Sequence, residues 1–312
     1  MAKKSSYHVR NWSEYNKSLI RRGSLTIWFN EESTGQWYER EGTGKRGRPA
    51  KYAGIAIECM LTLKAVFNLP LRSTQGLVES LVERLDLKIE VPDYTTVSRR
   101  QQELEVVLQK YQGNEPLHAV FDGTGLKIYG EGEWKVRQHG TSKRRTWRKM
   151  HLGVDEGSGE IIAVVLTTND FSDGEVLPTL VGQIENPIEQ ASGDGAYDTF
   201  ENHEVLEARG AKITIPPRAN AKIRQHGNCK APPLARDENL REIRKIGRAA
   251  WKKQNGYHRR SLAETAMYRF KKIFGGYLRA IIFQSQAVEA FIKCNALNKM
   301  TALGMPDSYA VA

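Results

Sequence analysis

The hydrophobic pattern of this 312-residue chain changes character near residue 110. Before that point apolar residues recur at every third or fourth position, as in residues 52–67, a spacing that is typical of amphipathic helices. Beyond it lie short β-rich runs such as residues 149–154 and 160–166, which are joined by a turn and followed by interleaved helical segments. We therefore predict a mainly helical region at residues 1–112, followed by an α/β domain at residues 113–312.

The helical region contains a candidate DNA-reading segment. Pro70 ends the helix at residues 52–67, Ser73 can cap the next helix, and Asp93 opens a third at residues 94–108. Two short helices followed by a polar, arginine-bearing one resemble a helix-turn-helix arrangement. The side chains that would face bases or phosphates are Thr95, Thr96, Ser98, Arg99 and Arg100. Many three-helix segments bind nothing, so a purely structural role is the alternative. The Gly- and Arg-rich residues 41–52 are likewise either a linker or a segment that lies along a DNA groove.

Positive charge is concentrated in one stretch of the chain. The net charge is +11, and residues 209–279 hold 19 Lys or Arg residues against four acids, so that stretch carries +15 and the rest of the chain −4. A generic basic protein with a solvated charged face would spread its charge along the chain. A concentrated positive surface instead suits a polyphosphate partner, because each phosphate that is neutralised releases condensed counterions.

Cysteine spacing and hydropathy exclude several protein classes. The three cysteines, Cys59, Cys229 and Cys294, form no CxxC pair and predict neither a zinc site nor a disulfide framework. The longest apolar run, residues 161–166, is far too short to span a bilayer. The basic residues 1–12 are followed by no apolar segment of the kind found in secretory signals. We expect isolated thiols in a reducing, cytoplasmic compartment and no membrane partner.

The helix expected at residues 257–274 has one narrow polar edge. On a wheel of roughly 100° per residue, Arg260, Glu264 and Lys271 all fall within about 60° of Tyr257. The neighbouring apolar arc contains Leu262, Ala266, Met267, Phe270, Ile273 and Phe274. The helix therefore has a core face and, beside it, an edge whose residue types suit a functional site.

Three acidic residues stand out by their settings. Glu264 is the only acid between Glu242 and Glu289, and the ordinary interpretation of a lone carboxylate among cations is a salt bridge. Asp122 and Asp194 each lie at an expected strand end beside glycine, which lets a bulky ligand approach the backbone closely. Asp-Gly pairs are usually turns, so neither motif is strong alone. Together with Glu264, however, they form a repeated spacing of 72 and 70 residues.

Such a set of carboxylates suits metal-dependent cleavage of phosphodiesters. That reaction needs an activated water or hydroxyl and a stabilised leaving oxygen, and two divalent cations roughly 3.5–4 Å apart can supply both. Hard cations such as Mg²⁺ prefer carboxylate oxygens, and their binding removes the repulsion that would raise the pKa values of three clustered acids. Asp198 is the chief rival of Asp194, whereas Asp155 and Asp170 are weaker rivals that are more simply interpreted as turn residues.

A basic run with aromatic residues precedes the second β-rich segment. Its cationic residues are Lys135, Arg137, Lys143, Arg144, Arg145, Arg148 and Lys149, and no acid interrupts them. Trp134 and Trp147 are interleaved and offer flat surfaces for a displaced base. The alternative is that the tryptophans belong to the core and the charges to a solvated loop. We favour contact with DNA.

These motifs resemble the DDE transposases of bacterial insertion sequences, in the branch called the insertion-sequence-five family. The third-carboxylate motif of that family is Tyr, two residues, Arg, three residues, Glu, six residues and Lys. It is met in full by Tyr257, Arg260, Glu264 and Lys271. The second motif is similar to the Asp-Gly-Ala-Tyr-Asp that begins at Asp194, and the first to the Asp-Gly-Thr-Gly that begins at Asp122. The resemblance runs over nearly the whole chain, and it selects Asp194 over Asp198.

The resemblance implies an RNase-H-like catalytic fold, which is a mixed sheet with flanking helices. Asp122 would lie on the first strand, Asp194 after a later strand and Glu264 on a helix, and these three would hold Mg²⁺ or Mn²⁺, two ions per active site. Tyr257, Arg260 and Lys271 would hold phosphate or DNA near the cut. No small-molecule cofactor is implied.

The implied partners are terminal inverted repeats and target DNA. A homo-oligomer would bring two element ends together. Because its partner is DNA, the protein would be associated with the nucleoid. Hydrolysis at each end would free a 3′-OH, which would attack target DNA in a transesterification that needs no external energy source. Two alternatives remain: a nuclease or resolvase that cuts without strand transfer, and a catalytically inactive DNA-binding regulator derived from a transposase. The intact carboxylate triad argues against the inactive regulator.

Overall fold

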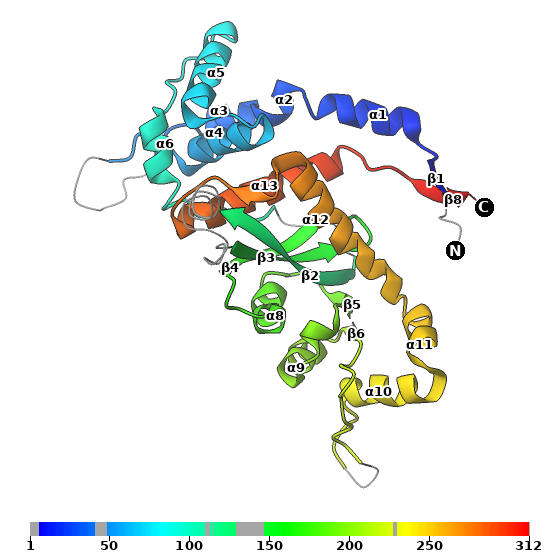
Figure 1. Cartoon of the computed structure of the whole chain (residues 1–312). Coiled ribbons are helices and arrows are strands. Elements are labelled where there is room, and N and C mark those ends of the chain that lie inside the picture. Colours follow the sequence, from blue (N-terminus) through cyan, green and yellow to red (C-terminus); the bar gives the residue numbers. More distant parts are fainter. Residues whose placement is uncertain are drawn as a thin grey trace, which may run out of the picture. The chain divides into compact units, whose positions relative to one another are not determined.

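A computed structural model describes residues 6–40, 49–109, 113, 115–128, 147–226 and 230–311 (Figure 1). The chain divides into two compact units. The first comprises Met1–Val106 together with Asn295–Ala312, and the second comprises Val107–Cys294. The long helix α13 (Phe283–Ala302) begins in the second unit and ends in the first.

The described part of the first unit is mainly helical. Its helices are α1 (Trp12–Arg21), α2 (Leu25–Trp28), α3 (Glu31–Gly35), α4 (Gly54–Val66), α5 (Leu71–Arg84) and α6 (Tyr94–Arg100). The expected apolar helix is confirmed as α4, whose Ile57, Met60 and Leu63 are fully buried. A two-stranded antiparallel sheet joins β1 (Ser6–Val9) to β8 (Ser308–Val311), a pairing that no local pattern predicted.

Helix α6 is shorter than the sequence suggests. We expected it to run from residue 94 to 108, but it ends at Arg100 and is followed by a turn. Beyond the turn, the side chain of Leu104 lies against the start of α4. A Cβ added to Gly54 would be 3.5 Å from that side chain. This tertiary contact outweighs the helical propensity of residues 101–108.

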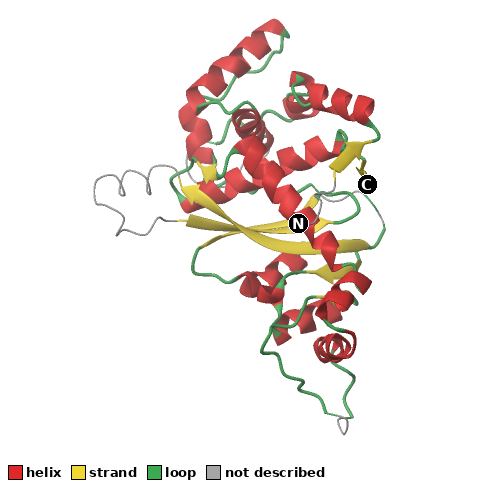
Figure 2. Ribbon diagram, turned by 45° about the vertical axis from the view of Figure 1, so that its right-hand side comes forward, coloured by secondary structure: helices red, strands yellow, loops and turns green. Residues whose placement is uncertain are grey.

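Six strands form a mixed sheet in the described part of the second unit (Figure 2). The strands are β2 (Leu117–Ile128), β3 (Trp147–Asp155), β4 (Ile161–Thr168), β5 (Ile188–Ser192), β6 (Lys212–Thr214) and β7 (Tyr277–Leu278). Their order is β4-β3-β2-β5-β6, and β7 pairs with β2 off this path. β3 is antiparallel to β2 and β4, whereas β5 is parallel to β2 and β6 to β5. This is an RNase-H-like sheet, so the expected fold class and the expected hairpin of β3 and β4 are confirmed.

Helices cover both faces of this sheet. Helix α12 (Ser261–Phe274) contacts β2 and β3 on one face, and α8 (Asp173–Gly182) contacts β2, β3 and β4 on the other (Figure 2). The remaining helical elements of the unit are η1 (Gly195–Tyr197), α9 (Phe200–Ala208), α10 (Ala235–Ile246), α11 (Arg248–Gln254) and η2 (Tyr257–Arg260). The core on the α8 side includes Phe121, Leu177 and Tyr197.

Strand β2 corrects one expectation about Asp122. We expected a short strand that ends at this residue, but β2 continues through Asp122 to Ile128. The Asp-Gly pair at this position is usual in turns. Here Asp122 and the Gly-Thr-Gly that follows it are paired with β3, and Asp122 lies opposite Leu152. The ring of Trp147 lies 3.4 Å from where a Cβ on Gly125 would be, so this glycine makes room for an aromatic ring across the sheet.

Two further observations concern thiols and hydropathy. Cys59 and Cys294 are free and buried, as expected of isolated thiols, and Cys229 lies outside the described residues. Within the described ranges, no single helix has the length and apolar character needed to cross a bilayer. Only α4 and α5 taken together, with a bend of 110° between them, meet that criterion of length and composition.

Candidate active site

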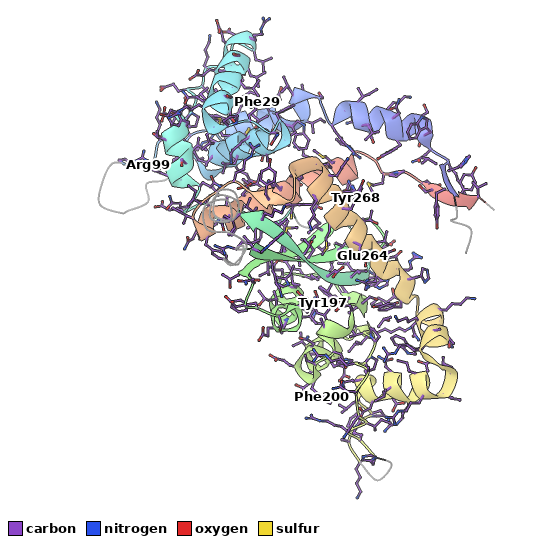
Figure 3. All side chains as sticks on the ribbon, in the orientation of Figure 1. Phe29, Arg99, Tyr197, Phe200, Glu264 and Tyr268 are labelled. Carbon is purple, nitrogen blue, oxygen red and sulfur yellow. The ribbon has the colours of Figure 1, made fainter. Side chains whose placement is uncertain are left out.

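Three separate elements carry the three candidate carboxylates. Asp122 lies in the middle of β2, Asp194 follows the end of β5, and Glu264 lies in the first turn of α12 (Figure 3). The backbone N–H of Gly123 donates to Asp122 Oδ1 at 2.9 Å. The backbone N–H of Ala196 donates to Asp194 Oδ1 at 2.8 Å, so Asp194 caps the short helix η1.

Arg260 joins two of these carboxylates. Its Nη1 donates to Asp122 Oδ2 at 3.1 Å, and its Nη2 donates to Glu264 Oε1 one helical turn further on. The side chain of Asp122 is 17% exposed and that of Glu264 is 53% exposed, so the site opens from the sheet towards solvent. A planar guanidinium with several fixed N–H donors is suited to such simultaneous contact with two carboxylates.

The charges at this site act on one another. Burial raises the pKa of Asp122, and the negative charges of Asp194 and Glu264 raise it further. The N–H of Gly123 and the cation of Arg260 oppose that rise. The structure therefore links Asp122 and Glu264 through Arg260, and the charge of Asp194 acts on Asp122 from a third element. A carboxylate in such a setting is stabilised by any additional positive charge.

The polar edge predicted from the helical wheel faces strand β2. Lys271 Nζ donates to Thr124 Oγ1 at 2.6 Å, two residues beyond the carboxylate to which Arg260 donates. Tyr257 and Arg260 belong to the 3₁₀ turn η2 that precedes α12, not to the helix itself, and Gly256 just before the turn is left-handed with φ of 66°. The ring of Tyr257 lies 4.7 Å from Lys252 Nζ and 5.9 Å from the guanidinium carbon of Arg260.

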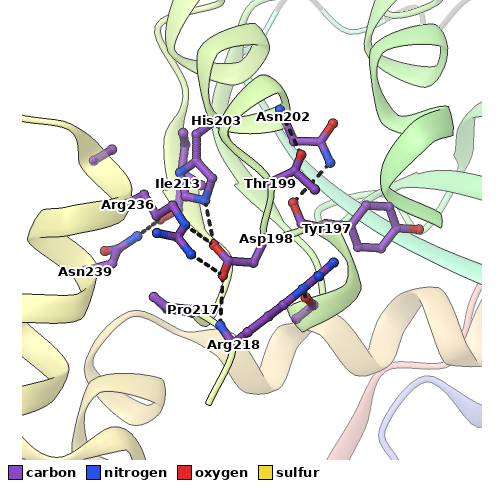
Figure 4. Close-up of polar contacts among 12 residues, drawn as sticks. Tyr197, Asp198, Thr199, Asn202, His203, Ile213, Pro217, Arg218, Arg236 and Asn239 are labelled. Carbon is purple, nitrogen blue, oxygen red and sulfur yellow. Dashed lines mark hydrogen bonds and ion pairs between the residues drawn. The ribbon is translucent and has the colours of Figure 1, made fainter. Parts of the chain in front are cut away.

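The chief rival, Asp198, has a structural setting (Figure 4). Its carboxylate is fully buried and accepts from Arg236 Nε at 2.7 Å and Arg236 Nη2 at 3.0 Å, and from the backbone N–H of Arg218 at 2.8 Å. His203 Nε2 lies 3.4 Å away. Burial alone would raise the pKa of Asp198, but these hydrogen bonds hold it well below its usual range. Because these contacts use both carboxylate oxygens of Asp198, they favour Asp194 over Asp198 as the second of the three carboxylates.

The two weaker rivals have settings of the kind expected for turn residues. Asp155 is buried and accepts from the backbone N–H and from Oγ of Ser158, both at 2.8 Å, in the turn between β3 and β4. Asp170 is exposed in the turn before α8.

The other residues proposed to contact DNA have varied settings. Arg148 Nε donates to Gln286 Oε1 at 2.8 Å and its guanidinium carbon lies 5.4 Å from the centre of the Phe283 ring, so this side chain is bound within the fold. Lys149 is half-buried, and its ammonium reaches the surface and donates to the carbonyl of Phe171 at 2.8 Å. Trp134, Arg144 and Arg145 lie outside the described residues.

Two arginines of α6 were also proposed to face DNA. Arg99 is exposed (Figure 3). Arg100 is half-buried, and its Nη1 donates to the carbonyl of Tyr52 at 2.9 Å. The two neighbours therefore differ: Arg99 is available at the surface, and Arg100 links α6 to the segment before α4.

A second polar cluster, which no local sequence pattern predicted, lies near Gly123 of β2. His151, Asp173 and Tyr197 belong to β3, α8 and η1, and each looked like an ordinary structural residue. Asp173 is the first residue of α8, and Ser172 before it is the N-cap, whose backbone N–H and hydroxyl both donate to Glu175 Oε2. The cross-strand pairing of His151 with Gly123 could have been inferred only from the register of β2 and β3.

The donor set fits a divalent cation in chemical type. Three carboxylates provide the hard oxygen ligands that Mg²⁺ and Mn²⁺ accept. Among the residues that the structure describes, however, no three Asp, Glu, His or Cys side chains are placed to hold one ion together. In this arrangement the guanidinium of Arg260 supplies positive charge to Asp122 and Glu264.

Comparisons with known proteins identify the family of the chain. Two family models, each described as a transposase DDE domain, match residues 20–131 and 113–299. The chain is also similar to a solved structure, the cryo-EM structure of piggyBac transposase synaptic complex with hairpin DNA. The match has 10% sequence identity and a TM-score of 0.39, and it covers 90% of this chain and 75% of that chain. The second model covers more than half of the chain and includes Asp122, Asp194 and Glu264. The chain therefore belongs to the DDE transposase family.

Proposed function

We propose that this protein is a metal-dependent DNA transposase that cuts at the ends of its own insertion sequence and joins those ends to target DNA. The observation that carries the proposal is the contact of the Arg260 guanidinium with both Asp122 and Glu264, beside a third carboxylate, Asp194, whose charge acts on Asp122. Clustered carboxylates that repel one another and lie beside a basic surface suit the binding of cations together with a polyphosphate.

Asp122, Asp194 and Glu264 would hold Mg²⁺ or Mn²⁺, two ions per active site. Bound there, the ions would activate a water or hydroxyl and stabilise the leaving oxygen of a phosphodiester. The chain's own residues then orient the DNA. Tyr257, Arg260 and Lys271 share one edge and can bind the phosphates on either side of the cut.

Two chemical steps follow from this assignment. Hydrolysis breaks the bond between phosphorus and a 3′ oxygen at each element end, which leaves a 3′-OH on the element. That hydroxyl attacks a target phosphorus and displaces the target's own 3′ oxygen, so one phosphodiester forms as one breaks. The number of phosphodiesters is unchanged in the second step, and no external energy source is required.

The helical region at residues 1–112 would recognise the terminal inverted repeats, and residues 113–312 would form the catalytic domain. Exposure of Arg99 at the end of α6 supports this division of labour, because exposed cations on a short helix suit contact with DNA. Two element ends must be held together for coordinated joining, so the active species would be a homo-oligomer on DNA.

The test uses the full chain and a duplex that carries the inverted repeats flanking its gene. We expect the wild-type protein with Mg²⁺ or Mn²⁺ to cut this duplex and to join the ends to plasmid DNA. Asp122→Asn, Asp194→Asn and Glu264→Gln should bind the duplex without cutting it, and Asp170→Asn, at an exposed turn, should cut normally.

Each contrary outcome has a definite meaning. Undiminished cleavage by one of the three carboxylate variants would remove that residue from the site. Binding without cleavage by the wild-type protein, in both metals, would identify a catalytically inactive regulator. Cleavage without joining would identify a nuclease or resolvase.

A further inference from the structure

Two consecutive arginines of η2 contact two different carboxylates of the sheet region. Arg260 donates to Asp122 in the middle of β2. Arg259 contacts Glu156, the residue that directly follows β3: its Nε donates to Glu156 Oε1, and its Nη2 forms an ion pair with the same oxygen. Successive side chains of a 3₁₀ turn point about 120° apart, so two such contacts fix both the position and the rotation of η2.

The two carboxylates belong to the same face of the sheet. The backbone N–H of Glu156 donates to the carbonyl of His118 at 2.9 Å, which continues the pairing of Ala119 with Asp155 by one residue. His118 and Asp122 are four residues apart on β2, and side chains at every second position of a strand share a face. Glu156, opposite His118, therefore lies on the face that carries Asp122 and contacts η2.

His118 connects Glu156 to a third strand. Its Nδ1 lies 3.7 Å from Glu156 Oε2, and its Nε2 lies 2.7 Å from Oγ of Ser192. Ser192 is the fully buried last residue of β5, two residues before Asp194. The side chains of His118 and Glu156 are each 15% exposed, so both are held mostly within the fold. A continuous series of contacts thus runs from the strand that precedes Asp194, across β2, to the residue before Arg260.

The contact of Arg259 differs from that of Arg260 in one respect that matters for the reaction. A cation bound by Asp122 and Glu264 would compete with the Arg260 guanidinium for their negative charge, which frees that guanidinium for a phosphate. Glu156 lies outside the set of candidate ligands, so its contact with Arg259 does not compete with the same cation. η2 would then stay on the sheet through Arg259 while Arg260 turns to the DNA.

We propose that Glu156 and Arg259 are positioning residues of the candidate active site, which hold η2 in place so that Tyr257 and Arg260 reach the phosphate at the cut. They act through η2 and do not touch the reacting atoms. The inference rests on the proposed function, since it presupposes a phosphodiester at this site. A misplacement of about 1 Å can lower a reaction rate by about 100-fold, so the loss of this anchor should affect the rate of cleavage more than the affinity for DNA.

The first test measures cleavage of the terminal-repeat duplex by the full chain at saturating Mn²⁺ and DNA. Glu156→Gln keeps the size of the side chain and removes its charge, and Arg259→Gln removes the partner. Each should lower the rate constant roughly 10- to 100-fold while the Kd for DNA changes little. The double variant should be about as slow as either single variant, because both changes break the same contact. Glu160→Gln, in the same turn, is the matched control and should cut at the wild-type rate.

The second test needs no cleavage. Amide hydrogen exchange, followed by mass spectrometry on the full chain, reports the local opening of individual segments. Glu156→Gln should speed exchange in a peptide that spans η2, and the increase should be larger with Mn²⁺ present, because Arg260 then no longer holds this turn. Exchange in peptides from α8 should match the wild-type protein. Faster exchange throughout the chain would show a general loss of stability and would overturn the assignment.

The outcomes separate this inference from the proposed function. If the wild-type protein does not cut the duplex, the proposed function fails, and exchange in η2 of the metal-free protein still decides whether Glu156 anchors this turn. If the wild-type protein cuts but Glu156→Gln cuts equally fast, or leaves exchange in η2 unchanged, only the positioning assignment fails. If Arg259→Gln alone weakens DNA binding and lowers the salt slope by about 0.9, Arg259 is a phosphate contact and the assignment is again overturned.

Discussion

Arg260 Nη1 lies 3.1 Å from Asp122 Oδ2, and through this contact a side chain of the turn before α12 neutralises a carboxylate in the middle of β2. The same guanidinium also holds Glu264. The guanidinium of Arg260 is thus hydrogen-bonded to two of the three carboxylates proposed to bind metal. Cation binding and release of Arg260 are therefore linked, because both compete for the same negative charges.

This linkage predicts the effect of Arg260→Gln on metal and DNA. Without DNA, the variant should bind Mn²⁺ roughly two- to fivefold more tightly, since partly exposed ion pairs are worth up to about 1 kcal/mol. It should bind DNA more weakly, because a phosphate-binding cation is lost. Calorimetry with Mn²⁺ and a gel-shift assay measure the two effects. Weaker Mn²⁺ binding by the variant would show that Arg260 organises the carboxylates and does not compete for them.

Asp122→Asn should stabilise the metal-free protein. The folded-state pKa of Asp122 is raised, so the folded state binds a proton more readily than the unfolded state, and stability falls as pH rises through that window. The gain in stability from Asp122→Asn should be present at pH values above the raised pKa of folded Asp122, and it should vanish below the pKa of an ordinary aspartate. Thermal melts at several pH values should show a rise in Tm of a few degrees at most near pH 7, since about 1 kcal/mol corresponds to roughly 2–4 °C. A lower Tm at neutral pH would contradict the repulsion described at the site.

Asp198→Asn should have the opposite effect on stability. It breaks a fully buried ion pair with Arg236 and leaves that cation without its partner, at a cost of roughly 3–5 kcal/mol. Because the pKa of Asp198 is lowered in the folded state, its contribution is present above the unfolded pKa and is lost as pH falls through the folded one. Urea denaturation measures the change, with Asp170→Asn as the control. If Asp198→Asn were as stable as the control but unable to bind Mn²⁺, Asp198 would replace Asp194 as the ligand.

Gly123→Ala tests the close approach of Asp173 to the backbone of β2. The added Cβ would lie 2.5 Å from Asp173 Oδ1, and the side chain that must move is held by His151. We expect a loss of about 1–3 kcal/mol of stability, which is typical of overpacking. Gly182→Ala, at the end of α8 with open space around the added methyl, should instead gain about 0.4–1 kcal/mol. Equal stability of the two variants would show that Asp173 moves aside freely.

Arg99 and Arg100 should separate DNA contact from folding. Arg99→Gln should weaken binding to the terminal repeat and lower the slope of log affinity against log salt by about 0.9, the value for one phosphate contact. Arg100→Gln should destabilise the first unit, because it removes the hydrogen bond to the carbonyl of Tyr52. Fluorescence anisotropy at a series of salt concentrations and thermal melts measure the two effects. An unchanged salt slope for Arg99→Gln would exclude Arg99 from the interface.

Local patterns predicted a large part of the fold and the site. The apolar spacing identified α4, and the turn at residues 155–159 identified the hairpin of β3 and β4, because both depend on neighbours in sequence. The polar edge of Arg260 and Lys271 was likewise readable from a helical wheel, and both side chains do contact β2.

Long-range contacts could not be predicted in this way. Glycines after Asp122 suggested a turn, but pairing with β3 extended the strand through them. His151 and Asp173 meet only when β3 and α8 are packed together, and nothing in their own segments indicates it. The partners of Arg260 and Arg236 are carboxylates 138 and 38 residues away, which a spacing rule does not identify. Electrostatic pairs of this kind depend on tertiary structure alone.

The pairing of β1 with β8 also sets an order of events during synthesis. Residues 6–9 must wait for residues 308–311, and at about 5–20 residues per second that wait lasts roughly 15–60 s. The segment Val107–Cys294 leaves the ribosome before Asn295–Ala312, so the second unit can be complete while the first unit still lacks its last segment. The proposed DNA-reading unit is thus completed only after the whole of Val107–Cys294 has been made.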